Sequence, residues 1–412
     1  MAYEKLVIAG AGLSSICFLK FISKNKSKKY DLLIIDLDKK LGRGAFCYND
    51  STLMNTPSEV LGLSSEKPHE FMSWYESKYL ESPPKFVERR VFGEYVYSSF
   101  MSSIKTLESN GSSIRIIDGY IDFFSDEYVC VDNNVYYFDS LILARGAKYN
   151  KLENLDIGHL IGETHKEIYN IKGSGLTAVD VSIEIIKRNP DAKVNLFSRS
   201  GKLPQVKSNY LTPITPKYFS ENELLNSISV SLRSIYRLAR KEFSSNGYDL
   251  FDTVFRSNCS DDIESFHNKI VIAENGDRFF NMILGMMLPL SSMWKYISKK
   301  DIYTYHSKIH RYIHYIHGAM PLIRAKELLI HMEEKRLSIN KHIQNMDFDI
   351  DCSGHERINK GFLYYCPNTF KLDGYKNVYG IGMEVRYSNP FMNNIERIVE
   401  VSEFLAGDIS VR

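Results

Sequence analysis

The chain has 412 residues, of which 44% are hydrophobic, so it is long enough for two or three domains with a large buried core. Its formal net charge of +2 comes from interspersed acidic and basic residues, a balance that gives no support to nucleic-acid binding. The six cysteines are scattered and include no Cys-x-x-Cys pair, which argues against a disulfide framework and against a redox-active dithiol.

The amino-terminal segment has the pattern of a nucleotide-binding βαβ unit. Residues 5–9, apolar after Lys5, are typical of a buried strand, and a turn containing Gly10 and Gly12 leads from it into a helical pattern. Ser15 stands where a third glycine is usual, and a small residue there still lets the helix pack closely on the sheet. A second apolar run ends at Asp36, where a carboxylate could accept a hydrogen bond from a ribose hydroxyl.

The next segment predicts one helix and several strands. Residues 68–80 have a helical pattern, and residues 112–120 and 128–138 alternate apolar and polar side chains, which predicts antiparallel strands. Residues 140–147 predict a buried strand that ends in a small-residue turn containing Ala144.

A second glycine turn lies about 160 residues after the first and again connects a strand-like run to a helix. It contains Gly173 and Gly175, and the helix that follows opens with Leu176 and Thr177. The third position of the motif is Ala178 instead of glycine. A tight turn that binds no nucleotide is the alternative interpretation of either motif.

The strand after this helix, residues 193–197, ends at Ser198 and Arg199. In a dinucleotide-binding fold this position faces the adenosine 2′ group, and an acid there would accept from a free hydroxyl. An arginine would pair with a 2′-phosphate through its planar fork of donors, so Arg199 favours NADPH over NADH. An ordinary surface arginine in a turn is the competing interpretation.

Residues 205–335 have an irregular, mostly helical pattern, with the clearest helices at 302–317 and 321–336, and we interpret them as an insertion that could form a substrate pocket. Four histidines at helical spacing share one face of the first of these helices. Neither a His-Glu-x-x-His motif nor an acidic third ligand accompanies them, so we predict no metal site. A substrate-facing pocket wall, with His314 as its candidate, and a partly exposed helix face are the two alternatives. The histidines are His306, His310, His314 and His317.

The last segment returns to strands and closes with a helix. Residues 348–355 predict a strand and a small-residue turn, residues 377–382 a strand that reaches Gly382, and residues 393–405 an amphipathic helix. The predicted fold is α/β, and the family resemblance given next implies an FAD-binding Rossmann-like three-layer domain with an inserted NAD(P)-binding Rossmann-like domain. Its predicted parts are 1–150 for the first part of the FAD-binding domain, 151–345 for the NAD(P)-binding domain with a helical insertion at about 205–335, and 346–412 for the return.

Taken together, these motifs resemble the flavoproteins with two dinucleotide-binding domains, and among them the class B flavin monooxygenases and amine N-hydroxylases. The resemblance covers nearly the whole chain and rests further on the Leu-x-Asn-x-Pro segment at 53–57 and the Arg-x-x-Gly-x-Tyr element at 90–95. Arg145 departs from the pattern, because a small hydroxyl residue is usual between Ala144 and Gly146. The resemblance implies FAD contacts at Gly10, Gly12, Leu13, Ser14, Asp36, Arg43, Asn55, Thr56, Ile121, Ala144, Gly146, Gly382 and Asn393, and NADPH contacts at Gly173, Gly175, Leu176, Thr177, Ser198 and Arg199.

The resemblance further implies an FAD-dependent, NADPH-using oxidoreductase, a monooxygenase of a small nitrogen- or sulfur-containing metabolite. Asn55 is the candidate for a hydrogen bond beside the flavin, with capping of the turn before Pro57 as the alternative, and Tyr387 and Asn389 are candidates for the substrate pocket. A flavin oxidase or dehydrogenase with a degenerate nicotinamide site and a non-catalytic FAD-binding sensor are the competing functions.

Location and partners follow from what the sequence lacks. The strand and glycine turn within the first ten residues leave no room for a signal peptide, and the uncharged stretch at 279–294 is too short to span a bilayer. We therefore expect a cytoplasmic protein with a small-molecule substrate and without membrane or nucleic-acid partners. The fold often dimerises, so a homodimer is compatible with the resemblance.

Overall fold

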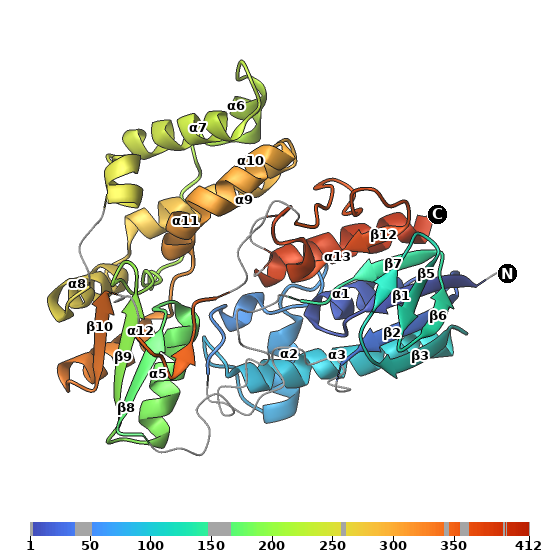
Figure 1. Ribbon diagram of the computed structural model, residues 1–412, viewed down its shortest axis with the longest axis horizontal. Helices are drawn as coiled ribbons and strands as arrows, with labels where there is room; N and C mark the ends of the chain where they lie inside the picture. Colours follow the sequence, from blue (N-terminus) through green and yellow to red (C-terminus); the bar gives the residue numbers. More distant parts are fainter. Residues whose placement is uncertain are drawn as a thin grey trace. The chain divides into compact units, whose positions relative to one another are not determined.

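The computed structural model describes residues 3–37, 52–146, 166–256, 261–341, 346–354, 362–389, 392 and 394–411. The chain divides into two compact units. Met1–Ala147 and Gly361–Arg412 form the first, and Lys148–Lys360 form the second. The first unit is thus built from two separate stretches of chain, drawn in blue to green and in red in Figure 1.

A five-stranded parallel sheet forms the centre of the first unit, in the order β12-β7-β1-β2-β3. The middle strand β1 is apolar and buried from Leu6 onward, as expected of a parallel strand that is covered on both faces. The bounds of the five strands are β1 (Glu4–Ala9), β2 (Tyr30–Asp36), β3 (Ser113–Asp118), β7 (Ser140–Leu143) and β12 (Val378–Gly380).

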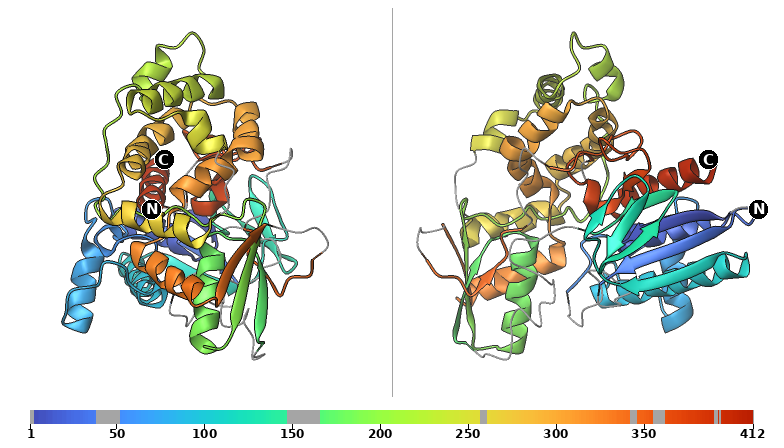
Figure 2. Two further views of the ribbon diagram at one scale, coloured as in Figure 1. Left: turned by 90° about the vertical axis from the view of Figure 1, so that its left-hand side faces the viewer. Right: turned by 45° about the vertical axis from the view of Figure 1, so that its right-hand side comes forward.

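Helices and a small second sheet cover the parallel sheet. Helix α1 packs against both α3 and α13, and the antiparallel sheet β4-β5-β6 joins the same core through Val129 and Val131. The parallel sheet lies between these two layers, which gives the predicted three-layer arrangement (Figures 1 and 2). The remaining elements are α1 (Leu13–Ile22), α2 (Glu70–Tyr79), α3 (Arg89–Ser109), β4 (Phe123–Phe124), β5 (Tyr128–Val131), β6 (Asn134–Tyr137) and α13 (Ile395–Val411).

The second unit has its own parallel sheet, in the order β10-β9-β8-β11. Its core contains the apolar sides of α5 (Leu176–Arg188), α8 (Ile263–Glu274) and α12 (Leu322–Glu333). Because β11 pairs with β8, the expected domain boundary at 346 falls inside this unit. Its strands are β8 (Ile168–Lys172), β9 (Lys193–Ser198), β10 (Leu337–Lys341) and β11 (Ile350–Asp351).

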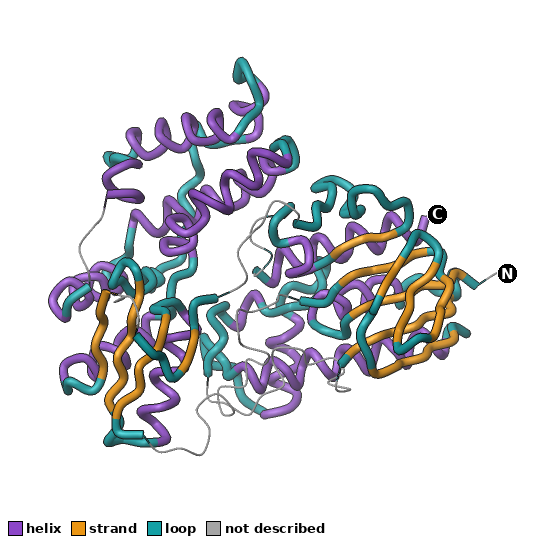
Figure 3. The backbone as a smooth tube through the Cα atoms, in the orientation of Figure 1, coloured by secondary structure: helices purple, strands orange, loops and turns teal. Residues whose placement is uncertain are grey.

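The chain between β9 and β10 is helical, as the predicted insertion requires, and Figure 3 shows its helices in purple. Two segments within it are π-helical, Phe251–Arg256 and Tyr305–Ile309. The second of them divides the helix predicted at 302–317 into α10, the π segment and α11. The helices not yet given are α6 (Glu221–Leu225), α7 (Leu232–Ser245), α9 (Arg278–Trp294), α10 (Lys299–Thr304) and α11 (His310–His317).

Two strand predictions are corrected by the structure. β3, predicted as antiparallel, is a parallel strand at the edge of the five-stranded sheet, and its mostly exposed side chains are consistent with that edge position. The strand predicted at 128–138 is a hairpin, in which β5 and β6 pair around Asp132 and Asn133, both of which have positive φ. A two-residue turn of this kind requires positive φ at both positions, and residues of the Asn and Asp type tolerate it.

Two negative predictions concern membrane helices and cysteine chemistry. Of the helices described, none combines the length and the apolar character needed to cross a bilayer. Cys17, Cys130, Cys352 and Cys366 are free thiols, and burial raises the pKa of Cys352 to about 12. The Cys352 thiol therefore stays protonated at neutral pH and lacks the thiolate that redox chemistry requires.

Candidate functional site

The first glycine turn connects β1 to α1 and is held by backbone contacts. Gly10 has φ +100°, and its N–H donates to the carbonyl of Ile35 over 2.7 Å. A Cβ on Gly10 would lie 2.3 Å from the carbonyl oxygen of Ala144, so the fold itself requires glycine here. The Ser15 hydroxyl, in place of the third glycine, donates to the Gly10 carbonyl over 2.5 Å and so closes the turn.

Gly12 stands in contrast to Gly10. It is the N-cap of α1, with an ordinary extended backbone and no side-chain cap among the described residues. Within that part of the chain, no atom lies within 4 Å of the position that a Cβ on Gly12 would take, other than its immediate neighbours and its own helix backbone. The fold therefore gives no steric reason for glycine at this position. The N–H groups that open α1 are of the kind that bind an anion at a helix N-terminus.

The second glycine turn, which connects β8 to α5, shows the same contrast between its two glycines. Gly173 has φ +118°, its N–H donates to Phe197, and a Cβ on it would lie 2.5 Å from the carbonyl oxygen of Cys352. Gly175 is the uncapped N-cap of α5, and its Cβ position is equally open in the described structure. The neighbouring Ser174 is buried, and its hydroxyl donates to the carbonyl of Lys202 over 2.5 Å.

The two small-residue turns predicted from the sequence lie beside the two glycine turns. Ala144 and Cys352 are the residues whose carbonyls face Gly10 and Gly173. Each of these carbonyls belongs to a turn that reaches a glycine with positive φ two residues later, Gly146 or Gly354. The two units thus build their turns in the same way from unrelated residues.

The residues expected at the ribose ends lie at matching positions of the two sheets. Ile35 accepts from Gly10, and Asp36 follows it directly at the end of β2. Phe197 accepts from Gly173 in the same way, and Ser198 and the exposed Arg199 follow it. The position of the acid in the first unit therefore corresponds to a serine followed by an arginine in the second.

The carboxyl-terminal segment completes the first turn. Ile381 donates to the carbonyl of Leu143, which places Gly382 just past β12 and beside β7. Gly382 has φ +64°, and a Cβ on it would lie 1.9 Å from the Ser14 hydroxyl oxygen at the start of α1. Ser14 and Gly382, two of the predicted FAD contacts, are thus close neighbours, and Leu13 opens α1 next to Ser14.

Arg145, which departs from the family pattern, has a defined partner. Its guanidinium donates twice to the Glu384 carboxylate, over 3.1 and 2.7 Å, and the Tyr365 hydroxyl donates to the same carboxylate over 2.9 Å. The Glu384 side chain is 8% exposed and that of Arg145 is 38% exposed. The pair connects the end of β7 to the turn that begins at Gly382, so it stabilises the segment next to the first glycine turn.

We expect Glu384→Gln to lower the free energy of unfolding by about 1–2 kcal/mol, because the neutral amide loses the ion pair while Arg145 is only partly solvated. Urea denaturation measures this change. Glu400→Gln is the matched control, since the Glu400 side chain is 60% exposed in its pair with Arg397. The control should change stability by less than about 0.5 kcal/mol. Equal losses in the two variants would contradict a structural role for the Arg145 pair.

The other predicted FAD contacts lie around the same unit. Asn55 and Thr56 follow a short bridge in which Met54 donates to Val87, and both keep partial exposure. Ile121 is half-buried and packs against the core of the unit. Arg43 and Asn393 fall outside the described residues.

Of the predicted substrate residues, Asn389 and Tyr387 lie in the first unit. Asn389 is 2% exposed and accepts from Arg397 over 3.0 Å, so it offers almost no surface to a substrate. The Tyr387 hydroxyl accepts from Arg386, whose guanidinium also lies over its ring.

His314 lies in the second unit, where its ring stacks on that of His310 with 5.4 Å between the ring centroids. The centroid of the His310 ring lies 5.1 Å from that of His306. Burial, and then the neighbouring His314, lower the pKa of His310 to about 4. No group of metal-ligating side chains is found in the described part of the chain.

One cluster near the second turn has no counterpart in the sequence-based prediction. Lys202 is buried and lies over the Tyr315 ring, and Lys269 donates to both the Tyr315 hydroxyl and the Asp261 carboxylate, each over 2.7 Å. Asp261 in turn accepts from the backbone of Leu203. These residues are far apart in the sequence, so no local signal could have shown that they surround the segment following Arg199.

Comparison with known proteins agrees with this geometry. Residues 7–148 match a family model described as FAD-NAD(P)-binding. A search of curated proteins finds no match. Ornithine hydroxylase from Pseudomonas aeruginosa superimposes with a TM-score of 0.56 at 10% identity, over 99% of this chain and 98% of that one.

Two further solved structures align over nearly their whole length. The cadaverine monooxygenase of Erwinia amylovora, solved with FAD, has a TM-score of 0.56 at 10% identity and covers 100% of this chain and 95% of its own. The ornithine N-hydroxylase of Kutzneria sp. 744, solved with reduced FAD, NADP+ and L-ornithine, has a TM-score of 0.53 at 10% identity and covers 100% of both chains. This chain has the fold of these hydroxylases. The resemblance inferred from the motifs is therefore confirmed at the level of the fold.

Proposed function

We propose that the chain is an FAD-dependent oxidoreductase that draws electrons from NADPH and acts as a monooxygenase of a small amine. The observation that carries the proposal is the pair of open positions at Gly12 and Gly175. Neither glycine is required by the described fold, and each opens a helix whose first N–H groups lack a side-chain cap. A bound pyrophosphate would explain glycine at both positions, because the absence of a side chain lets the phosphates approach the backbone N–H groups closely.

The residues of the first unit fit FAD. The opening N–H groups of α1 would bind its pyrophosphate, and Asp36 would accept from its adenosine ribose. Gly382 and Ser14 border the same turn, and Asn55 remains the candidate for a hydrogen bond near the ring. When bound, FAD supplies hydride acceptance and oxygen activation.

The residues of the second unit fit NADPH. The α5 N-terminus would bind the pyrophosphate, with Gly175, Leu176 and Thr177 at the turn. Ser198 and Arg199 stand where the first unit has its acid, and a guanidinium there suits a 2′-phosphate. The substrate class, a small amine, rests on the ornithine hydroxylase and the cadaverine monooxygenase that share the fold.

Anaerobic mixing of the purified protein with NADPH tests the proposal, with the visible flavin band as the readout. Rapid bleaching is expected, followed by oxygen uptake that increases with the correct amine. A flavin band that NADPH leaves unchanged would favour an oxidase or a sensor with a degenerate nicotinamide site. A purified protein without flavin would overturn the proposal at its first step.

Arg199→Ala should raise the KM for NADPH by roughly 10- to 100-fold and leave the KM for NADH nearly unchanged, because a charge-assisted hydrogen bond contributes about 1.5–3 kcal/mol. Initial-rate measurements with both cofactors check this. Arg188→Ala is the control, since Arg188 pairs with Glu184 in the last turn of α5, away from the glycine turn. An equal effect of Arg199→Ala on both cofactors would remove the argument for a 2′-phosphate.

The cytoplasmic location and the homodimer stay predictions. Sedimentation of the purified protein would establish whether it forms dimers, and cell fractionation would establish its location.

A further inference from the structure

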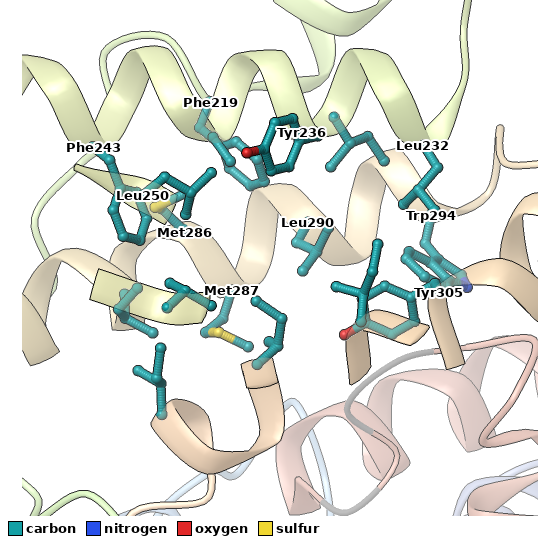
Figure 4. A pocket seen from close by; sticks show the side chains of 17 residues that line it. Phe219, Leu232, Tyr236, Phe243, Leu250, Met286, Met287, Leu290, Trp294 and Tyr305 are labelled. Carbon is teal, nitrogen blue, oxygen red and sulfur yellow. The ribbon is translucent and has the colours of Figure 1, made fainter. Parts of the chain in front are cut away.

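The helical part of the second unit forms a partly open apolar cavity of about 100 Å³ (Figure 4). Its wall is formed by side chains of α7, α9, α11 and the two π-helical segments, together with Phe219 and Leu250. The lining is almost purely hydrocarbon. Six of the lining residues define its extent: Phe243, Leu250, Met286, Leu290, Trp294 and Tyr305.

The cavity is unusual for a protein interior. Side chains normally fill such space, because unfilled volume forfeits dispersion contacts and destabilises the fold. For comparison, an engineered apolar cavity of about 150 Å³ stays dry and binds benzene. A cavity of similar size and chemistry therefore has room for a small apolar ligand.

Two π-helical segments contribute side chains to the wall of this cavity. Val254 comes from the first π-helical segment, and Tyr305 and Ile309 come from the second. π-Helical turns are rare and occur frequently at functional sites, where they reposition side chains. Two such segments lining one cavity form an observation independent of its volume.

Helix α9 is also irregular where it lines the cavity. Pro289 lies inside it and has no N–H to donate to the carbonyl of Gly285, which weakens the helix at this turn. A Cβ on Gly285 would lie 1.9 Å from the Ile214 carbonyl oxygen, so the other side of α9 is fixed by close backbone packing. The adjacent Met286 and Met287 face the cavity with flexible thioether chains that adapt to the shape of a ligand.

The shape and the chemistry of the wall select the ligand. Figure 4 shows the lining side chains spread along α9, from Phe243 and Leu250 at one end to Trp294 and Tyr305 at the other. A polar group buried among them would lose its hydrogen bonds to water without replacement. We propose that this cavity binds a short unbranched hydrocarbon chain, the alkyl part of an aliphatic molecule whose polar end stays outside. The proposal does not depend on the proposed reaction.

The two tryptophans of the chain allow a direct test. Trp294 lines the cavity, whereas Trp74 lies in the first unit beside Phe71. In a Trp74→Phe variant of the full-length purified protein, bromohexanol with bromine at the chain end is expected to quench Trp294 fluorescence in a saturable manner. A Trp294→Phe variant, which keeps Trp74, should show only the weak linear quenching of random collisions. Linear quenching in both variants would overturn the proposal.

A cavity-filling substitution provides the second arm. Ala239 lines the cavity with a small side chain, and Ala239→Leu in the Trp74→Phe background should weaken bromohexanol binding at least tenfold. If that variant does not fold, Ile283→Phe places extra volume in the same wall. Hexanol should raise the melting temperature of the parent protein and leave that of the filled variant unchanged. Equal bromohexanol affinity in the parent and the filled variant would show that the alcohol binds elsewhere.

Discussion

Replacing Gly12 with valine is expected to give a folded protein that purifies without flavin. Two charge-assisted hydrogen bonds lost from a pyrophosphate, at about 1.5–3 kcal/mol each, weaken FAD binding by roughly a hundredfold or more. The substitution costs the apoprotein only about 1 kcal/mol, because Gly12 has an extended backbone and an open Cβ position in the described structure. Flavin absorbance per mole of protein measures the first effect, and circular dichroism shows that the fold is retained.

Gly10→Ala separates a ligand effect from a folding effect. Gly10 has φ +100°, and its Cβ would meet the Ala144 carbonyl at 2.3 Å, so alanine strains the backbone in every state of the protein. We expect it to destabilise even the flavin-free protein by about 1–3 kcal/mol. If the Gly12→Val protein kept a full complement of flavin, the first turn would not be a pyrophosphate site.

Gly175→Val should leave the flavin in place and abolish its reduction by NADPH. The open position at Gly175 is the counterpart of Gly12 in the second unit, and the same loss of pyrophosphate contacts should raise the KM for NADPH by roughly a hundredfold. Anaerobic stopped-flow absorbance of the flavin band measures this. Dithionite, which needs no nicotinamide site, should still bleach the variant.

The control for this variant is Gly173→Ala. A Cβ on Gly173 would lie 2.5 Å from the carbonyl oxygen of Cys352, so alanine should destabilise the second unit. The comparison with the parent protein decides between two failures. Parent protein that NADPH does not reduce would contradict the proposed function. If NADPH reduces the parent and the Gly175→Val protein equally well, the proposed reaction stands. Only the placement of the nucleotide at Gly175 would then be contradicted.

The sequence predicted both glycine turns because each motif is local. An apolar run, a glycine with positive φ and a helix start follow one another within a few residues, so Gly10 and Gly173 could be recognised without long-range information. The positions of Asp36 and Arg199, at the ends of the next strands along the chain, could be predicted in the same way, and their contacts with a cofactor stay predictions. Their proximity to the turns follows from parallel strand pairing.

Elements that depend on distant partners were predicted less well. Helix α3 went unpredicted because Arg89–Ser109 contains Gly93 and five serines, which disfavour a helix interior, and its helical form is stabilised by packing on α1. The alternation of apolar and polar residues at 112–120 was interpreted as antiparallel pairing, whereas β3 pairs in parallel with β2 at the edge of the sheet. The hairpin around Asp132 was a local signal that was missed.

Two further features could not be predicted from the sequence, because each depends on contacts between residues that are far apart in the chain. Gly382 and Ser14 are far apart in sequence, and only the structure shows that their atoms would collide if a side chain were added. The apolar cavity forms between helices whose sequences are individually ordinary, so its existence depends on how they pack.

The position of β12 has a consequence for biosynthesis. The second unit is continuous in sequence, and a ribosome completes its strands before it reaches Val378–Gly380 and α13. Until those residues emerge, β7 has an open edge of unpaired backbone groups, and the apolar face that α1 turns toward α13 stays uncovered. Since domains generally fold as units during synthesis, residues 1–147 can complete their fold only after the carboxyl-terminal residues of the same unit have emerged.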